Sequence, residues 1–370
     1  MQEEDKKIRV AITHGDINGI GYEVILKTFA EPRMIELCTP VLYGSSKVMA
    51  YHRKNLDLPQ VNYTSINSAE ELNPNCLNLI NCTDEDIKVE IGQSTQAAGD
   101  AALKALEMAT ADMRAGLIDI LVTAPINKEN IQSEKFDFPG HTEYLHSKFP
   151  HGNNVLMILV ADNLRVAVAT GHTPIANVSA QLNKTELFNK IKLLNNTLAK
   201  DFDIQRPRIA LLGLNPHAGD GGVIGQEEID TIIPAINMAK DAGILCYGPF
   251  AADGFFGAGT YTEFDATLAM YHDQGLIPFK TLAMERGVNY TAGLQIVRTS
   301  PDHGTGFDIA GKGVASEVSM REAIYLAIDA YRNRQRFLEA NENPLRKQYY
   351  SRETDADLRR ELAKEEEDPI

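Results

Sequence analysis

Short runs of β-branched and other apolar residues alternate with longer stretches in which apolar residues recur every three or four positions. The short runs predict β-strands, and the longer stretches predict amphipathic helices. Strands are predicted at residues 8–13, 40–44, 77–81, 118–124, 155–161, 165–170, 208–213, 243–248, 267–271 and 294–297. Helices are predicted at 22–30, around 102–113 and at roughly 316–333. Because the two patterns alternate, the chain is expected to form an α/β fold with a largely parallel sheet.

The charged carboxyl-terminal segment breaks this pattern. From residue 341 onward, 15 of 30 residues are charged, 9 acidic and 6 basic. No apolar stripe is present that could pack against a core, so residues 341–370 are predicted to be a solvated helix or a disordered tail.

Composition narrows the class of protein. The chain has 370 residues, of which 44% are hydrophobic, enough to bury one large core or, as the preferred interpretation, two cores with a cleft between them. The formal charge of −15 argues against nucleic-acid binding, which depends on clustered lysine and arginine. The four cysteines, Cys38, Cys76, Cys82 and Cys246, show no metal-site spacing and are expected to be reduced and mostly buried.

No segment of the sequence indicates a membrane or export. The longest apolar runs, such as 155–161, are far shorter than the roughly 20 residues that a bilayer requires. The charged amino-terminal residues lack the apolar centre of a secretory signal. We therefore expect a cytoplasmic protein.

Three histidines follow three of the predicted strands. His172, His217 and His272 stand one to four residues after the strands 165–170, 208–213 and 267–271. Neighbouring parallel strands would bring their carboxyl ends together, where open α/β sheets bind ligands. Three imidazoles and an open position form a catalytic site for zinc and similar cations. Three unrelated loop histidines remain the alternative.

Two acidic residues could orient an imidazole at such a site. Asp273 directly follows His272, and Asp302 follows the last predicted apolar strand. A carboxylate that accepts a hydrogen bond from one ring nitrogen leaves the other nitrogen free for a cation. Both aspartates are equally consistent with simple turn formation.

Two glycine-rich loops could bind an anion or a cofactor. The loop 13–23 joins a strand to a helix, where backbone N–H groups favour anions, but its glycine spacing is a weak dinucleotide signal and a structural turn explains it equally well. The segment 300–313 reads Ser-Pro-Asp-His-Gly-Thr-Gly-Phe-Asp-Ile-Ala-Gly-Lys-Gly. Such a long polar loop inside a folded chain is typical of a functional site.

The segment 300–313 resembles the loop that binds the adenosine end of the cofactor in the isocitrate and isopropylmalate dehydrogenase superfamily. Within that superfamily, the three histidine motifs are similar to those of the 4-hydroxythreonine-4-phosphate dehydrogenases. So are Val-Thr-Ala-Pro-Ile-Asn-Lys at 122–128, Gly-His-Thr-Glu-Tyr-Leu at 140–145 and Tyr-His-Asp-Gln-Gly-Leu-Ile-Pro-Phe-Lys at 271–280. The resemblance covers residues 8–335. It departs from the family at His14 and Ile17, where proline is usual, and at Gly254, where threonine is usual.

The resemblance implies a set of site residues. His172, His217 and His272 would bind a divalent metal such as zinc, magnesium or cobalt. The substrate would contact His141, Thr142, Lys280, Asn289 and Arg298. NAD or NADP would contact His303, Gly304, Thr305, Asp308 and Gly311. Lysine and arginine suit the phosphate and carboxylate of a small phosphorylated hydroxy-amino acid.

The resemblance also implies the architecture and the reaction. It implies a two-lobed subunit with one lobe at 1–135 and 295–340, a second at 136–294, and an active site in the cleft, completed by the partner of a homodimer. The reaction would be oxidation of 4-phosphohydroxy-L-threonine to a 3-oxo acid that decarboxylates, in pyridoxal 5'-phosphate biosynthesis. Lys280 and His141 are the candidate catalytic residues, although a chain of water molecules would serve equally well as the base.

Three other functions remain open from the sequence. A related dehydrogenase could act on phosphorylated threonate, erythronate or cyclic diols. A metal-dependent phosphatase or hydrolase could use the same histidines, because a cation with an open position also activates water. A non-catalytic metal- or phosphate-binding protein is the third.

Overall fold

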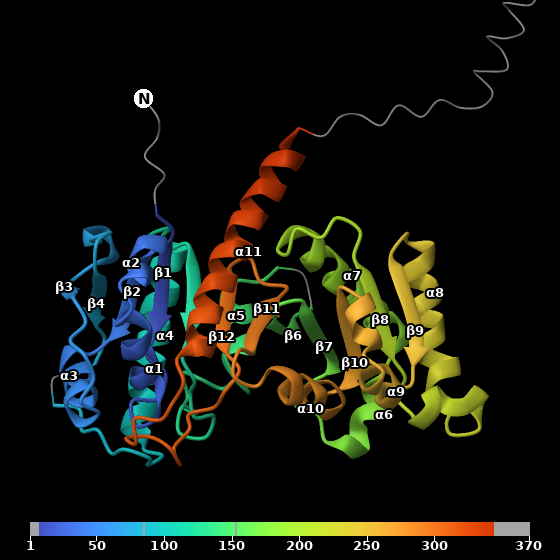
Figure 1. Cartoon of the computed structure of the whole chain (residues 1–370), viewed down its shortest axis with the longest axis horizontal. Coiled ribbons are helices and arrows are strands. Elements are labelled where there is room, and N and C mark those ends of the chain that lie inside the picture. The colour runs from blue at the N-terminus through green and yellow to red at the C-terminus, as the bar shows by residue number, and fades with distance from the viewer. Residues whose placement is uncertain (1–6, 84–85, 152–153, 344–370) are drawn as a thin grey trace, which may run out of the picture. The chain divides into compact units, whose positions relative to one another are not determined.

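Twelve strands form one sheet that runs through the part of the chain described by the computed structural model, residues 7–83, 86–151 and 154–343 (Figure 1). The strands are β1 Arg9–Thr13, β2 Thr39–Gly44, β3 Tyr63–Ile66, β4 Leu77–Asn81, β5 Ile120–Thr123, β6 Leu156–Ala161, β7 Leu164–Thr170, β8 Arg208–Leu212, β9 Leu245–Phe250, β10 Ala266–Tyr271, β11 Val288–Ala292 and β12 Val297–Pro301. Their order across the sheet is β3-β4-β2-β1-β5-β12-β11-β6-β7-β10-β8-β9.

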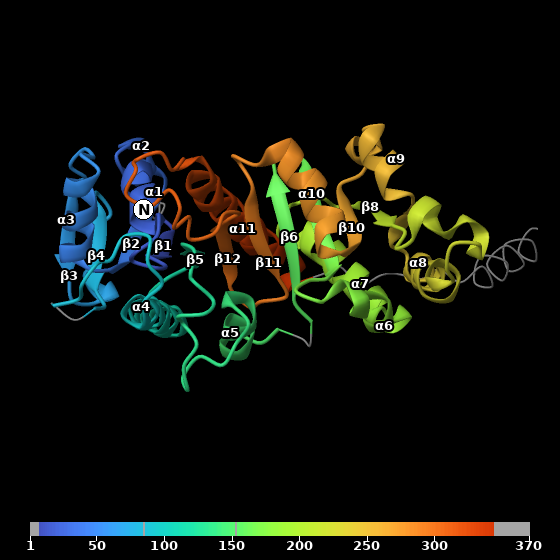
Figure 2. The same ribbon diagram turned by 90° about the horizontal axis from the view of Figure 1, so that it is seen from below.

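Helices cover both faces of the sheet. They are α1 Gly21–Phe29, α2 Arg33–Leu37, α3 Ser46–Asn55, α4 Gln96–Arg114, α5 His141–Lys148, α6 Val178–Gln181, α7 Lys184–Lys200, α8 Ile233–Asp241, α9 Ala252–Gly257, α10 His272–Ala283 and α11 Val318–Glu342. Figure 2 shows α1 and α4 on opposite sides of β1. The α/β class predicted from the alternating pattern is confirmed.

Alternate residues of the central strands face different helices. Val10 and Ile12 belong to the core that contains the buried residues of α1 and α11, whereas Ala11 packs with those of α4 and α5. This alternation follows from the two-residue period of a strand. The described residues up to Arg334 form one compact unit. The two lobes implied by the resemblance stay a prediction.

The sheet is parallel in two blocks rather than throughout. Strands β3, β4, β2, β1, β5 and β12 run parallel to one another, as do β7, β10, β8 and β9. Between the blocks, β11 is antiparallel to both β12 and β6, and β6 is antiparallel to β7. The prediction of a largely parallel sheet is therefore confirmed, and the junction between the two blocks is its antiparallel exception.

Some strands were missed because their residues do not look apolar. The segment 294–297, interpreted as a strand before Arg298, contributes only Val297, because Gly293 turns the chain with a φ of 88°. The strand β12 instead carries Arg298, Thr299 and Ser300, all buried. Polar residues in a central strand give no hydrophobic pattern, so only pairing with β5 and β11 reveals them.

The cysteines and the carboxyl-terminal helix can also be compared with their predictions. All four cysteines are buried and unpaired, as predicted. The last helix is longer than the predicted 316–333, ending at Glu342. The charged tail lies outside the described residues except for positions 341–343. Among the residues that the structure describes, every helix is too short or too polar to cross a bilayer.

Candidate active site

A cavity of about 280 Å³ lies where the two parallel blocks meet. Its walls come from the carboxyl ends of β5 and β12, from β11 and β6, from the start of α5, and from the residues that follow β7 and β10. Thr123, Arg298, Asn289 and Met157 share one face of the sheet, because strand register places them at alternating positions. The cavity thus collects residues far apart in the sequence.

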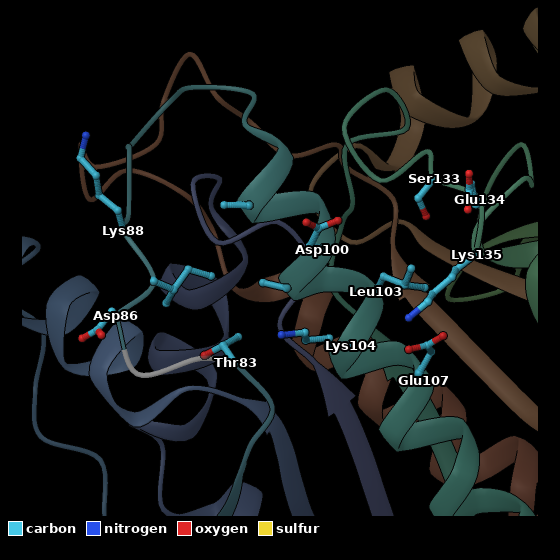
Figure 3. A pocket seen from close by; sticks show the side chains of 13 residues that line it. Thr83, Asp86, Lys88, Asp100, Leu103, Lys104, Glu107, Ser133, Glu134 and Lys135 are labelled. Atoms are coloured by element: carbon cyan, nitrogen blue, oxygen red, sulfur yellow. The ribbon is translucent and has the colours of Figure 1, made fainter.

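A larger cavity, of about 750 Å³, lies along the exposed side of α4 (Figure 3). Its charged side chains have both signs, including Lys88, Lys135, Asp100 and Glu107. None of the site residues predicted from the sequence lines it. Size alone therefore does not locate the chemistry, and the smaller cavity is the candidate site.

His172 and His272 meet at this cavity. Their ring centroids are 5.8 Å apart, and both line it. They follow β7 and β10, which are paired in the sheet, and the third histidine-bearing strand, β8, is the next neighbour. The prediction that these three strands lie side by side with their carboxyl ends together is confirmed.

The surroundings of the two rings differ. Nδ1 of His272 lies 2.6 Å from the Asp273 carboxylate, the orienting contact expected for Asp273. Nε2 of His172 lies 3.1 Å from the ammonium of Lys128. Burial, followed by the charges of Lys128 and His272, lowers the pKa of His172 below its ordinary value, so the ring is neutral at pH 7. A neutral imidazole is the form that binds a cation.

His217 does not join this pair within one chain. It is exposed on the turn Pro216–Gly222, and among the described residues no three His, Cys, Asp or Glu side chains lie close enough to hold a metal ion. His217, Ala218 and Asp220 all have positive φ angles, a strained conformation for residues other than glycine. The donor chemistry of His172 and His272 fits a divalent cation, and these are the two of the three predicted imidazoles that lie together among the described residues.

The buried Glu228 carboxylate holds the base of the His217 turn. Its Oε1 accepts hydrogen bonds from the backbone N–H groups of Leu214 and Asn215, at 2.7 and 2.8 Å. Its Oε2 accepts from the Asn215 amide at 2.9 Å. These hydrogen bonds from Glu228 fix the residues between β8 and the strained turn, and so hold the turn in place relative to β8.

Arg298 is a buried cation without a carboxylate partner. Its side chain is 3% exposed and donates only to hydroxyls, at 2.6 Å to Thr123 and 3.0 Å to Thr291. No described carboxylate lies within ion-pair distance of it. Burial lowers its pKa to about 10, so it stays charged at pH 7. A buried, unpaired guanidinium in a cavity is suited to bind an anion.

His141 and Thr142 begin α5 beside Arg298 and line the same cavity. Burial, then the charges of Arg298 and Lys128, holds the pKa of His141 well below its ordinary value. The ring is therefore neutral at pH 7 and can donate or accept a hydrogen bond there. The structure brings both predicted residues to the cavity.

Lys280 and Asn289 approach from α10 and β11. The Lys280 ammonium lies 3.8 Å from the Asp302 carboxylate, whose pKa is raised by burial. The side-chain oxygen of Asn289 is buried and has no hydrogen-bond partner among the described residues. Asp302 contacts Lys280 and makes no hydrogen bond to any of the three predicted metal-binding histidines. An unsatisfied amide oxygen in a cavity is available to a ligand.

The predicted cofactor loop packs against the first glycine-rich loop. The backbone N–H of Ile20 donates to the Thr305 carbonyl at 2.9 Å, and a Cβ on Gly19 would lie 2.5 Å from that oxygen. Of the five predicted cofactor residues, His303 and Gly304 reach the cavity. Thr305, Asp308 and Gly311 are not among its lining residues. The glycines at 19 and 21 therefore serve close packing, the structural interpretation of the 13–23 loop.

The Lys27–Glu23 ion pair joins the end of the 300–313 loop to α1. The Lys27 ammonium contacts Glu23 and donates to the carbonyls of Gly313 and Ala315, at 2.9 and 2.6 Å. Glu23 in turn accepts from the Ala315 N–H at 2.9 Å. The loop is thus held at both ends by the first strand-helix unit.

Sequence reasoning missed several residues of the cavity. Thr123, Lys128, Glu143, Thr291 and Ser300 each line the cavity or bind Arg298. Lys128 and Glu143 lie in the motifs 122–128 and 140–145, which were noted only for their resemblance. Charged residues close to glycine and proline in these motifs were the sequence feature from which their place in the cavity could have been predicted.

Comparisons with known proteins agree on one family. The family model described as "Pyridoxal phosphate biosynthetic protein PdxA" matches residues 36–327. A 4-hydroxythreonine-4-phosphate dehydrogenase of Bacteroides thetaiotaomicron is 58% identical over 354 residues, covering 96% of this chain and 97% of that protein. The crystal structure of the 4-hydroxythreonine-4-phosphate dehydrogenase from Klebsiella pneumoniae matches with a TM-score of 0.76 at 34% identity, covering 89% of this chain and 99% of that one.

A relative with another substrate shares the fold. The terephthalate 1,2-cis-dihydrodiol dehydrogenase of Burkholderia xenovorans matches with a TM-score of 0.57 at 29% identity. The match covers 87% of this chain and 98% of that one.

Proposed function

The chain belongs to the PdxA family of pyridoxal phosphate biosynthetic proteins, and on that premise we propose that it oxidises 4-phosphohydroxy-L-threonine with NAD or NADP. The hydride leaves carbon 3 for the nicotinamide, and the hydroxyl proton passes to a base. The resulting 3-oxo acid loses carbon dioxide to form 3-amino-2-oxopropyl phosphate. The chain is thus an oxidoreductase that acts on a secondary alcohol in vitamin B6 biosynthesis.

The observation that carries this proposal is the unpaired Arg298 in a cavity that it shares with the paired rings of His172 and His272. Arg298 and Lys280 provide positive charge for the phosphate and carboxylate of the substrate. Thr142 and Asn289 offer uncharged polar groups that orient it, and neutral His141 can exchange a hydrogen bond with a substrate oxygen. Lys280 and His141 are the residues proposed nearest to the reacting hydroxyl, with Lys280 or a water molecule as the base.

A divalent cation such as zinc, magnesium or cobalt, held by His172, His272 and His217, would supply Lewis acidity to the oxygen being oxidised. The loop of His303, Gly304, Thr305, Asp308 and Gly311 is proposed to seat the dinucleotide. Its glycines allow close approach of the backbone to a phosphate.

We further propose that the site is completed in a homodimer. Two of the three imidazoles lie together in one chain, and His217 stands exposed on its own turn. Large apolar side chains near these residues are exposed, among them Val223 at 81%, Ile175 at 75% and Ile277 at 64%. Burial of such side chains against a second copy would stabilise the dimer.

The substrate is tested by assaying the purified protein on a panel with NAD and with NADP. Turnover is expected on 4-phosphohydroxy-L-threonine and is followed by the absorbance of the reduced nicotinamide. Phosphorylated threonate and erythronate, and a cyclic cis-diol, serve as competitors, the last because of the Burkholderia relative. Turnover on a competitor but not on 4-phosphohydroxy-L-threonine would reject the specific substrate. Cofactor-independent phosphate release would favour a phosphatase.

The metal role is tested by His217→Ala. This exposed side chain contributes little to the core, so the fold should persist while turnover is abolished. Asp220→Asn, an exposed neighbour on the same turn, is the matched control and should retain activity. Full activity of the His217 variant after treatment with a chelator would rule out a catalytic metal there.

A further inference from the structure

Lys128 occupies a position in the candidate site to which neither the sequence motifs nor the family resemblance gave a role. It follows β5, and its ammonium lies 3.1 Å from Nε2 of His172. It lines the same cavity as Lys280 and Arg298. The substrate-binding residues predicted from the sequence therefore share their cavity with a third cation, one in direct contact with a proposed metal ligand.

The contact between Lys128 and His172 occupies the ring nitrogen through which His172 would bind a cation. A neutral imidazole has one protonated nitrogen and one lone pair in the ring plane. An ammonium can only donate a hydrogen bond, so the Lys128 ammonium donates to the lone pair on Nε2 of His172. A neutral ring has no second lone pair in its plane with which to bind a cation. His272 is arranged in the opposite way, because Asp273 binds its Nδ1 and leaves the lone pair of Nε2 available.

The rest of the cavity offers Lys128 a second partner when an anion is present. Lys280 is already 3.8 Å from Asp302, and Arg298 is held by two threonine hydroxyls. The Glu143 carboxylate and Cε of Lys128 each lie 3.7 Å from the place of a Cβ on Gly140, yet no ion pair joins the two side chains. A phosphate or sulfate in the cavity would attract the Lys128 ammonium away from His172.

We propose that Lys128 is a further ligand-binding residue that couples the binding of a divalent cation to the binding of the anionic substrate. While its ammonium engages His172, it competes with the cation for one lone pair and repels its charge. When an anion occupies the cavity, Lys128 binds the anion and the lone pair is released. The coupling is reciprocal, so the cation also strengthens anion binding. This inference rests on the proposed function of the site.

The test measures cation binding directly, without turnover. The full-length protein is freed of metal with a chelator, and Co²⁺ is titrated by calorimetry with and without sulfate, an anion probe that keeps cobalt in solution. Lys128→Met, which preserves length and removes charge, should bind Co²⁺ about tenfold more tightly than the wild type in the absence of sulfate. Sulfate should tighten Co²⁺ binding by the wild type and leave the Lys128→Met variant unchanged.

The charge-retaining Lys128→Arg variant is the matched control and should restore both the weaker Co²⁺ binding and the response to sulfate. Equal Co²⁺ affinity of wild type and Lys128→Met without sulfate would overturn the proposal. So would an undiminished sulfate response in Lys128→Met. A wild type that binds Co²⁺ and shows the coupling but fails to oxidise 4-phosphohydroxy-L-threonine would reject the proposed substrate alone. A wild type that binds no Co²⁺ would reject both the metal role and the coupling.

Discussion

Two buried arginines in this molecule have opposite surroundings. Arg334, on α11, is 6% exposed and donates to both carboxylate oxygens of Asp201, at 2.8 and 2.9 Å, and to the Tyr290 hydroxyl at 3.1 Å. Arg298 is 3% exposed and donates only to two threonine hydroxyls. One charge is neutralised within the chain, and the other is not.

The pKa values of the two arginines respond in opposite directions. Burial alone would lower the pKa of Arg334, but Tyr290 and Asp201 together raise it above its ordinary value. Burial lowers the pKa of Arg298 to about 10, and the opposing charge of Glu143 does not offset it. A paired buried charge joins elements of the fold, whereas an unpaired one is tolerated where a ligand supplies the missing charge.

The largest expected effect is on activity. Arg298→Met removes the cation proposed to bind the substrate anion, so kcat/KM should fall by about a thousandfold or more. Thermal stability should be unchanged or higher, because an unpaired buried charge is replaced by an apolar side chain of similar length. Steady-state kinetics and a melting curve check this. A large loss of stability with kcat/KM intact would reverse the roles assigned to the two arginines.

The next effect is on stability. Arg334→Met leaves the buried Asp201 carboxylate without its charged partner, so the free energy of unfolding should fall by about 3 kcal/mol. Chemical denaturation measures that change, and kcat/KM of the folded protein should stay near the wild-type value. The double variant Arg334→Met with Asp201→Asn is the control and should recover part of the loss. An unchanged free energy of unfolding would show that the contacts of Arg334 with Asp201 and Tyr290 do not stabilise the fold.

The smallest effect concerns a third buried group, His14. Its ring stacks on Tyr22 with centroids 5.4 Å apart, and both of its nitrogens lack hydrogen-bond partners among the described residues. Burial lowers its pKa from 6.5 to about 4. Between these values the unfolded chain binds more protons than the folded chain. Stability is therefore lost as the pH falls through that window.

For His14 that loss should be about 2 kcal/mol between pH 7 and pH 5. His14→Phe keeps an aromatic ring against Tyr22 but cannot bind a proton. The difference in unfolding free energy between the two pH values should therefore shrink by about that amount. Burial also lowers the pKa of His52 to about 4, so the unfolding free energy of the His14→Phe variant should still depend on pH through His52. An identical pH dependence in both proteins would show that His14 is not the responsible group.

Most of the predicted strands agree closely with the structure. The strand predicted at 77–81 is β4, and that at 165–170 begins one residue earlier as β7. These segments are apolar and bounded by turn residues, which local sequence shows directly. The placement of His172 and His272 beside each other also followed, because neighbouring strands carry them to one end of the sheet. The strands β3 and β11 were not predicted, since their short sequences mix polar and apolar residues.

The sequence predicted which residues form the candidate site, but it did not predict the contacts that they make. His141, Thr142, Lys280, Asn289 and Arg298 all line the cavity, as expected of one binding site. That Arg298 lacks an acidic partner could not be read from the chain. Its neighbours Thr123 and Thr291 come from strands 175 and 7 residues away in sequence.

The sequence by itself determined which segments become strands and helices and which chemical groups follow them, because hydrophobic period and turn residues act over a few positions. Tertiary structure alone decided which charges are paired. The sequence does not distinguish Arg298 from Arg334. The packing of α11 against the end of α7 gives Arg334 the carboxylate of Asp201, whereas β5 and β11 offer Arg298 only hydroxyls. The physical reason is that the energy of a buried charge depends on partners brought in from distant parts of the chain.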